Sequence, residues 1–426
     1  MRPIFIGILT VLSVIAPGYS QSKMDTTLIQ QLDEVVVSDS RFELTRENSG
    51  KTVITIGAEV LERNQGVPIA ALLNQFGGIE IGGSRSRQGE ILGVFSRGGR
   101  GRQVLVLLDG VRVSDPSSFS QEYDLRSLAI SNIESIEIIK GAASTLYGTN
   151  AATAVINIKT KKSADESIAA TFRAQMGTNQ TASDQNYRLA NFSNSAQISG
   201  TLEAFTYSMA VTNDYANGIS SLSTTTLEED PFSRTQTEVR LGYHPSETFS
   251  LTVYGQERRL RNNYDETFGF VDAPNQFVSL QKRAGVSGNL NYPRGNVNLN
   301  AAFTEYDSEN FSAFPSTFRG DNFIMDVFNR YTIGNKLFTV LGVNYSRDRT
   351  IFANSAQTTQ LDPYFNLVFV SGKGWNINSG ARINVHSEYG SHWVYNLNPS
   401  YSIKLNTGYL KGLFSYSTAF IVPSLT

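Results

Sequence analysis

Residues 375–403 read WNINSGARINVHSEYGSHWVYNLNPSYSI, and apolar and polar side chains alternate along them with a period of two. Trp375 and Ile377, for example, each precede an asparagine. Successive side chains of a β-strand point to opposite faces, so such strands have one apolar and one polar face. The same alternation recurs at residues 205–211 and 297–303. Repeated two-faced strands therefore dominate the second part of the chain.

Two architectures suit two-faced strands, a soluble sandwich and a transmembrane β-barrel. The segments run about 9 to 12 residues, the length that a tilted strand needs to cross a bilayer. Aromatic residues gather at segment ends, as in interfacial girdles. A short turn at 244–247 alternates with long polar stretches at 213–235 and 261–279. These features favour the barrel, with about thirteen strands between Glu166 and Ser417, and the sandwich is the alternative.

Composition excludes several classes of protein. The 426 residues carry a formal charge of −2, so no excess of basic residues indicates binding to nucleic acid. There is no cysteine and there are only three histidines, which argues against disulfides, thiolate sites and imidazole-rich zinc sites.

Residues 1–20 have the basic start, apolar stretch and small cleavage-site residues of a signal peptide. We therefore expect export, and an apolar stretch of about 13 residues is too short for a membrane anchor.

The region before the alternating strands has a different pattern. Residues 52–56, 104–108, 133–139 and 155–158 have the composition of strands, and 58–63 and 68–74 have helical spacing. Gly77 and Gly78 are predicted to end the second helix, and Asp109 and Gly110 to form a turn. The predicted organisation is a signal peptide (1–20), a leader (21–45), an α+β domain (46–162) and a strand-rich region (163–426).

Short motifs of this region resemble those of the TonB-dependent outer-membrane receptors, and in particular the cobalamin receptors among them. The motifs, in order, are LDEVVVS (32–38), FSRGG (95–99), VLVLLDGVR (104–112), IESIEIIKG (133–141), STLYG (144–148) and AVINI (154–158). The resemblance implies an α+β plug domain inside an antiparallel transmembrane β-barrel of twenty-two strands. With about thirteen strands in 426 residues, we expect the chain to be C-terminally truncated.

The resemblance also implies a function, the active uptake of a scarce nutrient through the outer membrane, with no catalysis. Energy would come from TonB, an inner-membrane protein that binds the TonB box. The box corresponds here to Asp33, Glu34, Val35, Val36, Val37 and Ser38. A β-branched stretch can pair with a partner through main-chain hydrogen bonds. An ordinary first strand of the plug is the alternative interpretation of these residues, and a surface lipoprotein is a further candidate partner.

Two polar plug loops, 82–89 and 114–119, are expected to face the outside and to contact the ligand. The candidate contacts are Arg85, Arg87, Gln88, Ser114 and Ser117. The same residues could equally be solvated loop residues.

Acidic residues of the long loops suggest calcium, which takes six to eight oxygen ligands. The cobalamin receptors bind calcium in such loops, and the resemblance transfers this role to Asp214, Glu228, Asp230, Tyr264, Asp265 and Asp272. Solvated loop tips are the alternative. The resemblance further implies that Arg97 is buried and paired with acidic groups.

Several other functions were weighed. Gly98–Gly101 lacks the spacing and the preceding strand of a nucleotide-binding loop. The segment around Phe420 reads FIVP, whereas the haem receptors of the family carry FRAP. A ferric siderophore receptor is the nearest alternative to a cobalamin receptor. A passive pore and a barrel hydrolase are the alternatives from other classes, and three scattered histidines make the hydrolase a poor fit.

Overall fold

The computed structural model describes residues 35–36, 39–82, 93–118, 121–180, 182–183, 185, 187–218, 222, 229–266, 271–351, 355–406, 408–423 and 425. Two units divide the chain at Glu34, and the second, Val35–Thr426, contains every described residue.

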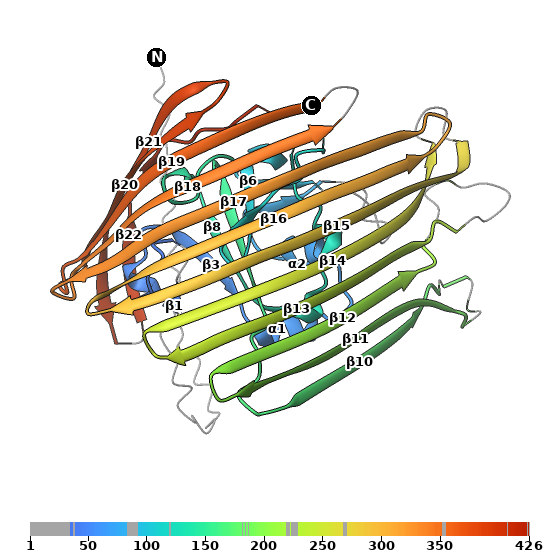
Figure 1. Cartoon of the computed structure of the whole chain (residues 1–426), viewed down its shortest axis with the longest axis horizontal. Helices are drawn as coiled ribbons and strands as arrows, with labels where there is room; N and C mark the ends of the chain where they lie inside the picture. Colours follow the sequence, from blue (N-terminus) through green and yellow to red (C-terminus); the bar gives the residue numbers. More distant parts are fainter. Residues whose placement is uncertain are drawn as a thin grey trace, which may run out of the picture. The chain divides into compact units, whose positions relative to one another are not determined.

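One large antiparallel sheet, called the wall below, contains every strand from β10 onward (Figure 1). Its strands are β10 (Ala169–Thr178), β11 (Leu189–Leu202), β12 (Phe205–Ala216), β13 (Phe232–Ser246), β14 (Phe249–Glu266), β15 (Val271–Tyr292), β16 (Gly295–Phe311), β17 (Ser316–Ile333), β18 (Leu337–Ile351), β19 (Ser355–Val370), β20 (Trp375–His386), β21 (Gly390–Leu405), β22 (Gly408–Leu413) and β23 (Tyr416–Ser417). Strands β10 to β22 pair in sequence order, and β23 pairs with β21. These thirteen consecutive strands match the predicted number in the part of the chain that the structure describes.

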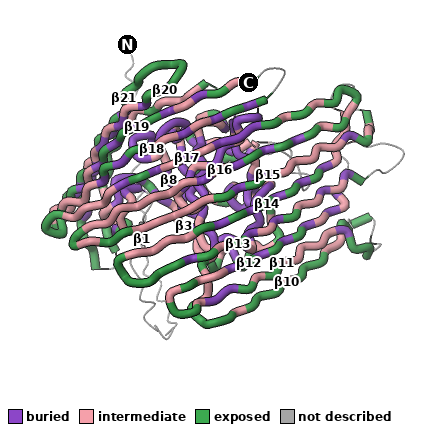
Figure 2. The backbone as a smooth tube through the Cα atoms, viewed as in Figure 1, coloured by how far each residue is buried: buried purple, intermediate pink, exposed green. Residues whose placement is uncertain are grey.

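The two faces of the wall differ in polarity in the direction that a membrane requires. Trp375 and Leu397 are 55% and 47% exposed, whereas Asn376 and Asn398 are 2% and 0% exposed. Exposed and buried residues therefore alternate along the wall strands (Figure 2). A soluble sandwich would bury the apolar side chains instead, so the structure excludes that alternative. The apolar face of the wall is its outer face, and the polar face is its inner face.

The α+β region, called the plug, lies against the inner face of the wall and forms its own sheet in the order β3-β8-β9-β6-β7. Its elements, with the short leader strands, are β1 (Val35–Val36), β2 (Leu44–Thr45), η1 (Arg46–Asn48), β3 (Thr52–Ile56), α1 (Ala58–Arg63), α2 (Ile69–Leu73), β4 (Ile79–Ile81), β5 (Val94–Ser96), η2 (Gly101–Gln103), β6 (Val104–Leu108), β7 (Val111–Val113), η3 (Leu125–Ser127), η4 (Ile130–Asn132), β8 (Ile133–Lys140), α3 (Ser144–Tyr147) and β9 (Ala154–Thr160).

The core of the plug surrounds this sheet. All five residues of β6 are buried, as the apolar run VLVLL predicts, and β6 pairs in parallel with β9. Asp109 and Gly110 both have positive φ, 52° and 78°, in the turn that joins β6 to β7. A two-residue turn of this kind requires positive φ at both positions, so glycine suits the second one. The predicted turn is confirmed.

Some boundaries differ from the prediction. Helix α2 ends at Leu73 with Asn74 as its C-cap, so Gly77 and Gly78 do not end it. The short helix α3 lies within a stretch for which no helix was predicted. Among the described residues, no helix has the length and the apolar character needed to cross a membrane.

The wall strands also extend further than predicted. Strand β14 continues to Glu266 and β15 begins at Val271 and is 22 residues long, so most of the predicted loop 261–279 is strand. Likewise, β12 ends at Ala216 and β13 begins at Phe232. Polar residues in these extensions resemble loop residues in the sequence, but main-chain pairing with neighbouring strands keeps them in the sheet. A short turn is present as predicted, but it lies at residues 247–248 and not at 244–247, since β13 continues to Ser246 and Ser246 pairs with Phe249.

Candidate functional site at the plug–wall interface

The leader is paired within the chain itself. Val35 and Val36 form β1, which pairs antiparallel with β2, so that Val35 lies opposite Thr45. Asp33, Glu34, Val37 and Ser38, the other predicted residues of the TonB box, lie outside the described residues. The described part of the box thus already uses one strand edge for main-chain pairing.

Arg41 fixes the end of the leader to the wall. Its Nη1 lies 2.7 Å from Asp326 Oδ2 on β17, and its Nη2 donates to the Leu146 carbonyl at 3.2 Å. The guanidinium carbon also lies 4.1 Å from the ring centroid of Phe328. Burial alone lowers the pKa of Arg41, but the Asp326 carboxylate outweighs it and holds the pKa above its ordinary value. The Tyr364 hydroxyl donates to the other Asp326 oxygen at 2.9 Å.

Asp39 fixes the same segment to the plug. Its Oδ2 accepts hydrogen bonds from Ser49 Oγ at 2.6 Å and from the Gly50 amide at 2.8 Å. Burial outweighs these bonds and raises the pKa of Asp39. Burial likewise lowers the pKa of the nearby Lys51 to about 8. Force applied to the leader therefore reaches Asp39 and Arg41 before it reaches the plug sheet.

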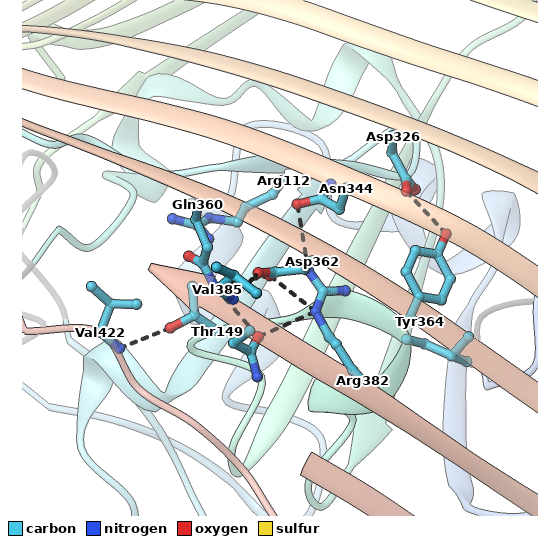
Figure 3. Close-up of polar contacts among 12 residues, drawn as sticks. Arg112, Thr149, Asp326, Asn344, Gln360, Asp362, Tyr364, Arg382, Val385 and Val422 are labelled. Atoms are coloured by element: carbon cyan, nitrogen blue, oxygen red, sulfur yellow. Dashed lines mark hydrogen bonds and ion pairs between the residues drawn. The ribbon is translucent and has the colours of Figure 1, made fainter. Parts of the chain in front are cut away.

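A second ion pair lies deeper in the wall (Figure 3). Arg382 on β20 and Asp362 on β19 are 2% and 1% exposed, and Arg382 Nη2 lies 2.6 Å from Asp362 Oδ2. Gln360 Nε2 donates to the same carboxylate at 2.8 Å, and the Val385 amide donates to its other oxygen at 3.2 Å. Bonds from several donors satisfy the buried carboxylate, as a buried charge requires.

The plug touches this ion pair at Gly148, the residue after α3. A Cβ atom at Gly148 would lie 2.5 Å from Arg382 Nη2, and the φ of Gly148 is +82°. Glycine is therefore required there both by the space and by the backbone. A third pair, Arg112 and Asp348, joins the plug and β18 at 3.6 Å. We call the contacts with β17 to β20 the anchored side of the plug.

The opposite part of the interface contains a cavity of about 500 Å³. Plug residues 65–70 and parts of 115–126 line it, together with residues of β10 to β16 such as Ser193 and Asp214. Asp124 and Arg126 pair with each other at 2.7 Å on the plug side of the cavity. We call this region the cavity side.

Arg234 on β13 joins the plug to the wall across the cavity side. Its Nε donates to Asp214 Oδ2 at 2.9 Å, and its Nη1 donates to the Arg126 carbonyl at 2.7 Å and to the Leu128 carbonyl. One guanidinium thus neutralises a carboxylate of the wall and satisfies carbonyls around η3 of the plug.

Of the predicted ligand contacts, Arg85, Arg87 and Gln88 lie outside the described residues. Ser114 and Ser117 are 4% and 1% exposed, so both side chains are buried in this structure. The Ser117 hydroxyl and amide both donate to Asp115 Oδ1, and the loop packs against Gly320 on β17. Asp115 and Ser118 of the same loop line the cavity. Whether these residues contact a ligand stays a prediction.

The predicted calcium ligands are only partly brought together. Asp214 pairs with Arg234, and the Tyr264 hydroxyl contacts Asn310 Oδ1. Asp265 and Asp272 lie at the adjoining ends of β14 and β15, and Asp230 lies two residues before the start of β13. Glu228 lies outside the described residues. No group of three or more His, Cys, Asp or Glu residues in the described part of the chain is arranged to hold a metal ion.

The expected burial of Arg97 is wrong. Arg97 is exposed and has a φ of 52° in the turn after β5, where the Gly99 amide donates to the Ser96 carbonyl. The turn directs the residue away from the core, so no buried acidic partner is needed. Arg41, Arg234 and Arg382 are instead largely covered arginines that pair with acidic groups. The two wall arginines, Arg234 and Arg382, lie on the polar face of a strand.

Comparisons with known proteins agree with this architecture. The family model of the TonB-dependent receptor plug domain matches residues 45–155. The vitamin B12 transporter BtuB of Photobacterium profundum is 24% identical over 408 residues, covering 92% of this chain and 62% of that protein. BtuB of Vibrio vulnificus is 34% identical over 135 residues, which cover 32% of this chain and 22% of that protein. The chain spans under two thirds of the length of these curated relatives.

Solved structures share the fold. The siderophore receptor PirA from Acinetobacter baumannii has a TM-score of 0.73 at 17% identity, covering 90% of this chain and 63% of that one. The ferripyoverdine receptor of Pseudomonas aeruginosa has a TM-score of 0.70 at 13% identity, covering 92% and 60%. The fold is thus that of a plugged outer-membrane β-barrel. Residues 45–155 therefore match the plug domain of the TonB-dependent receptors, and the chain as a whole is similar to transport receptors of that family.

Proposed function

We propose that the chain serves the TonB-energised active uptake of a scarce nutrient, and that the nutrient is cobalamin or a similar corrinoid. The observation that carries the choice of ligand is the similarity to the BtuB transporter of Photobacterium profundum over 92% of the chain. The solved structures of similar fold are named as siderophore receptors, which supports a ferric siderophore as the second candidate.

The geometry favours a gated receptor over a passive pore. Arg41, Arg112 and Arg234 tie the leader and the plug to the inner face of the wall at three separate places. A solute can cross such a structure only if some of these contacts break. The cavity of about 500 Å³ on the cavity side has the size range of small-molecule sites.

Deletion of residues 33–38 tests the energy coupling. We expect uptake to be abolished while ligand binding persists, because these residues are proposed to bind TonB and lie outside the plug. Deletion of six residues at 24–29 is a matched control that should leave uptake intact. Unchanged uptake after the first deletion would identify a passive pore.

Competition binding tests the ligand. Labelled cyanocobalamin should bind the receptor in detergent, and excess unlabelled cyanocobalamin should displace it while ferric chelates should not. Displacement by a ferric chelate, with no cyanocobalamin binding, would instead support the siderophore candidate.

Calcium and the signal peptide belong to the same proposal. Calcium would order the external loops through Asp265, Asp272 and their neighbours, which lie at adjoining strand ends. The described carboxylates do not themselves form a ligand set. Protease resistance of these loops should rise with calcium chloride, and the rise should be lost in D265N/D272N.

Export would proceed through residues 1–20, and mass spectrometry of the mature N-terminus would test cleavage before Gln21.

A further inference from the structure

Six polar side chains form a compact patch on the inner face of β14, β15 and β16. In the register of the sheet, Arg283 lies opposite both Gln256 and Thr304, and Gln281 lies opposite both Arg258 and Tyr306. The patch therefore consists of two adjacent rows of three. Every member is between 1% and 6% exposed: Gln256, Arg258, Gln281, Arg283, Thr304 and Tyr306.

The plug contributes Tyr123 to this patch, and the Tyr123 hydroxyl donates to Gln281 Oε1 at 3.4 Å. Arg258 Nη1 donates to the hydroxyl of Tyr123 at 3.0 Å, and Arg258 Nη2 donates to Gln256 Oε1 at 2.9 Å. Tyr123 precedes η3 by two residues and is itself buried. The patch is thus enclosed between the wall and the plug.

Many donors of the patch have no hydrogen-bond partner among the described residues. The unsatisfied N–H groups are those of Arg258 Nε, Arg283 Nε and Nη2, Gln256 Nε2 and Gln281 Nε2, and the unsatisfied hydroxyls are those of Thr304 and Tyr306. A buried donor without a partner costs about 1–3 kcal/mol, and native proteins contain few of them. Their concentration in one place indicates that a further group accepts their hydrogen bonds.

The charges indicate the sign of that group. Within the part of the chain that the structure describes, neither Arg258 nor Arg283 forms an ion pair, whereas the largely covered Arg41, Arg234 and Arg382 each pair with an aspartate. Glu238, which lies opposite Gln256, pairs with Arg240 through Oε1, and its Oε2 is a buried acceptor without a partner among the described residues. Two buried arginines without a directly paired carboxylate are unfavourable.

We propose that this patch binds one small oxyanion, of the chemical class of phosphate or sulfate, between the wall and the plug. Guanidinium groups present planar N–H forks that match oxyanions, and the amide and hydroxyl groups supply further donors. The anion neutralises both arginines, and through Arg258 it stabilises the contact with Tyr123. The patch thereby holds the segment before η3 against the wall next to the cavity.

Equilibrium dialysis of the protein in detergent against radiolabelled inorganic phosphate tests the proposal, with the ionic strength held constant by chloride. We expect saturable binding of one phosphate per chain and competition by sulfate. In R283Q the affinity should fall by at least about tenfold, since a charged hydrogen bond contributes about 1.5–3 kcal/mol. R259Q is the matched control, because Arg259 is the next residue of β14 after Arg258 but is exposed. Its affinity for phosphate should be unchanged.

Three results would overturn the proposal. The first is the absence of saturable binding, which would mean that water satisfies the donors. The second is an equal loss of binding in R283Q and R259Q. The third is displacement of phosphate by chloride at equal ionic strength. If R283Q does not fold, T304V and the wild type decide the question. T304V should weaken phosphate binding several-fold. Addition of the wild-type protein should broaden the ³¹P resonance of phosphate.

Discussion

The two sides of the plug–wall interface differ in how closely the surfaces are packed. On the anchored side, charged pairs with β17 and β18 and the contact of Gly148 with Arg382 join the surfaces closely. Toward the cavity side, Arg234 and the ion pairs Arg240–Asp109 and Arg173–Glu62 join β13 and β10 to the plug. Among the described residues, only this part of the interface also contains a cavity of about 500 Å³, and we therefore expect the plug to move more easily there. Substitutions on the two sides should separate these roles.

The largest effect is expected for D362A. The substitution leaves Arg382 buried at 2% exposure without its counter-charge, which costs about 3–5 kcal/mol. Trp375 and Trp393 are the two tryptophans of the chain and lie on β20, the strand of Arg382, and on the neighbouring β21, so their fluorescence during unfolding in guanidinium reports the loss. The double variant D362L/R382M should recover much of the stability. Equal destabilisation by the single and double variants would argue against an electrostatic cause.

Loss of Arg41 should have the next largest effect, on the anchored side. R41A removes the pair with Asp326 and the contact with the Phe328 ring, and we expect a cost of about 2–3 kcal/mol. The leader should then become accessible to protease while the plug sheet stays protected. R63A is a control, since the Glu59–Arg63 pair is 76% exposed on both sides and contributes little. Unchanged protection of the leader in R41A would show that Asp39 suffices to hold it.

A smaller effect is expected for R234Q on the cavity side. The loss of hydrogen bonds to the Arg126 and Leu128 carbonyls should cost about 1–2 kcal/mol and should release η3. Amide hydrogen exchange of residues 125–128 should accelerate, whereas exchange of residues 144–148 on the anchored side should not change. Equal acceleration on both sides would show that the plug undocks as one unit and would remove the proposed asymmetry.

The smallest effect concerns pH. Burial raises the pKa of Asp115 from its ordinary 3.8 to about 6. The folded state therefore keeps this proton up to about pH 6, whereas the unfolded chain releases it near pH 4. The resulting stability is fully present below about pH 4 and is lost as the pH rises through 6. Thermal unfolding of the wild type between pH 4 and 7 should show this loss, and in D115N it should be absent.

The sequence is sufficient to predict the wall because each strand carries its own local pattern. The alternation around Trp375 and Asn376 predicts both the strands and which side chains share a face, and the 55% and 2% exposures confirm it. The ends of the strands are harder to predict from the sequence. Arg261 and similar residues are polar, but they lie where the strand continues to pair past its alternating apolar residues. There the main chain of the neighbouring strands determines the structure.

The candidate site depends on contacts that no local pattern encodes. Arg41 and Asp326 are 285 residues apart in the chain, and their pairing depends on the register of the whole wall. For Arg97, a local motif leads to the wrong expectation. The motif indicates a buried arginine, but Arg97 is exposed in a turn where its φ is positive. Loop composition predicts a polar loop around Ser117, but it does not predict that packing against Gly320 buries this side chain.

The polar inner face of the wall has a consequence for hydration. Asn376, Asn378, Asn396 and Asn398 are almost completely covered while the plug is in place. If the plug withdrew from them, these amides would be wetted, and the inner face of the wall would become a hydrated surface next to the plug.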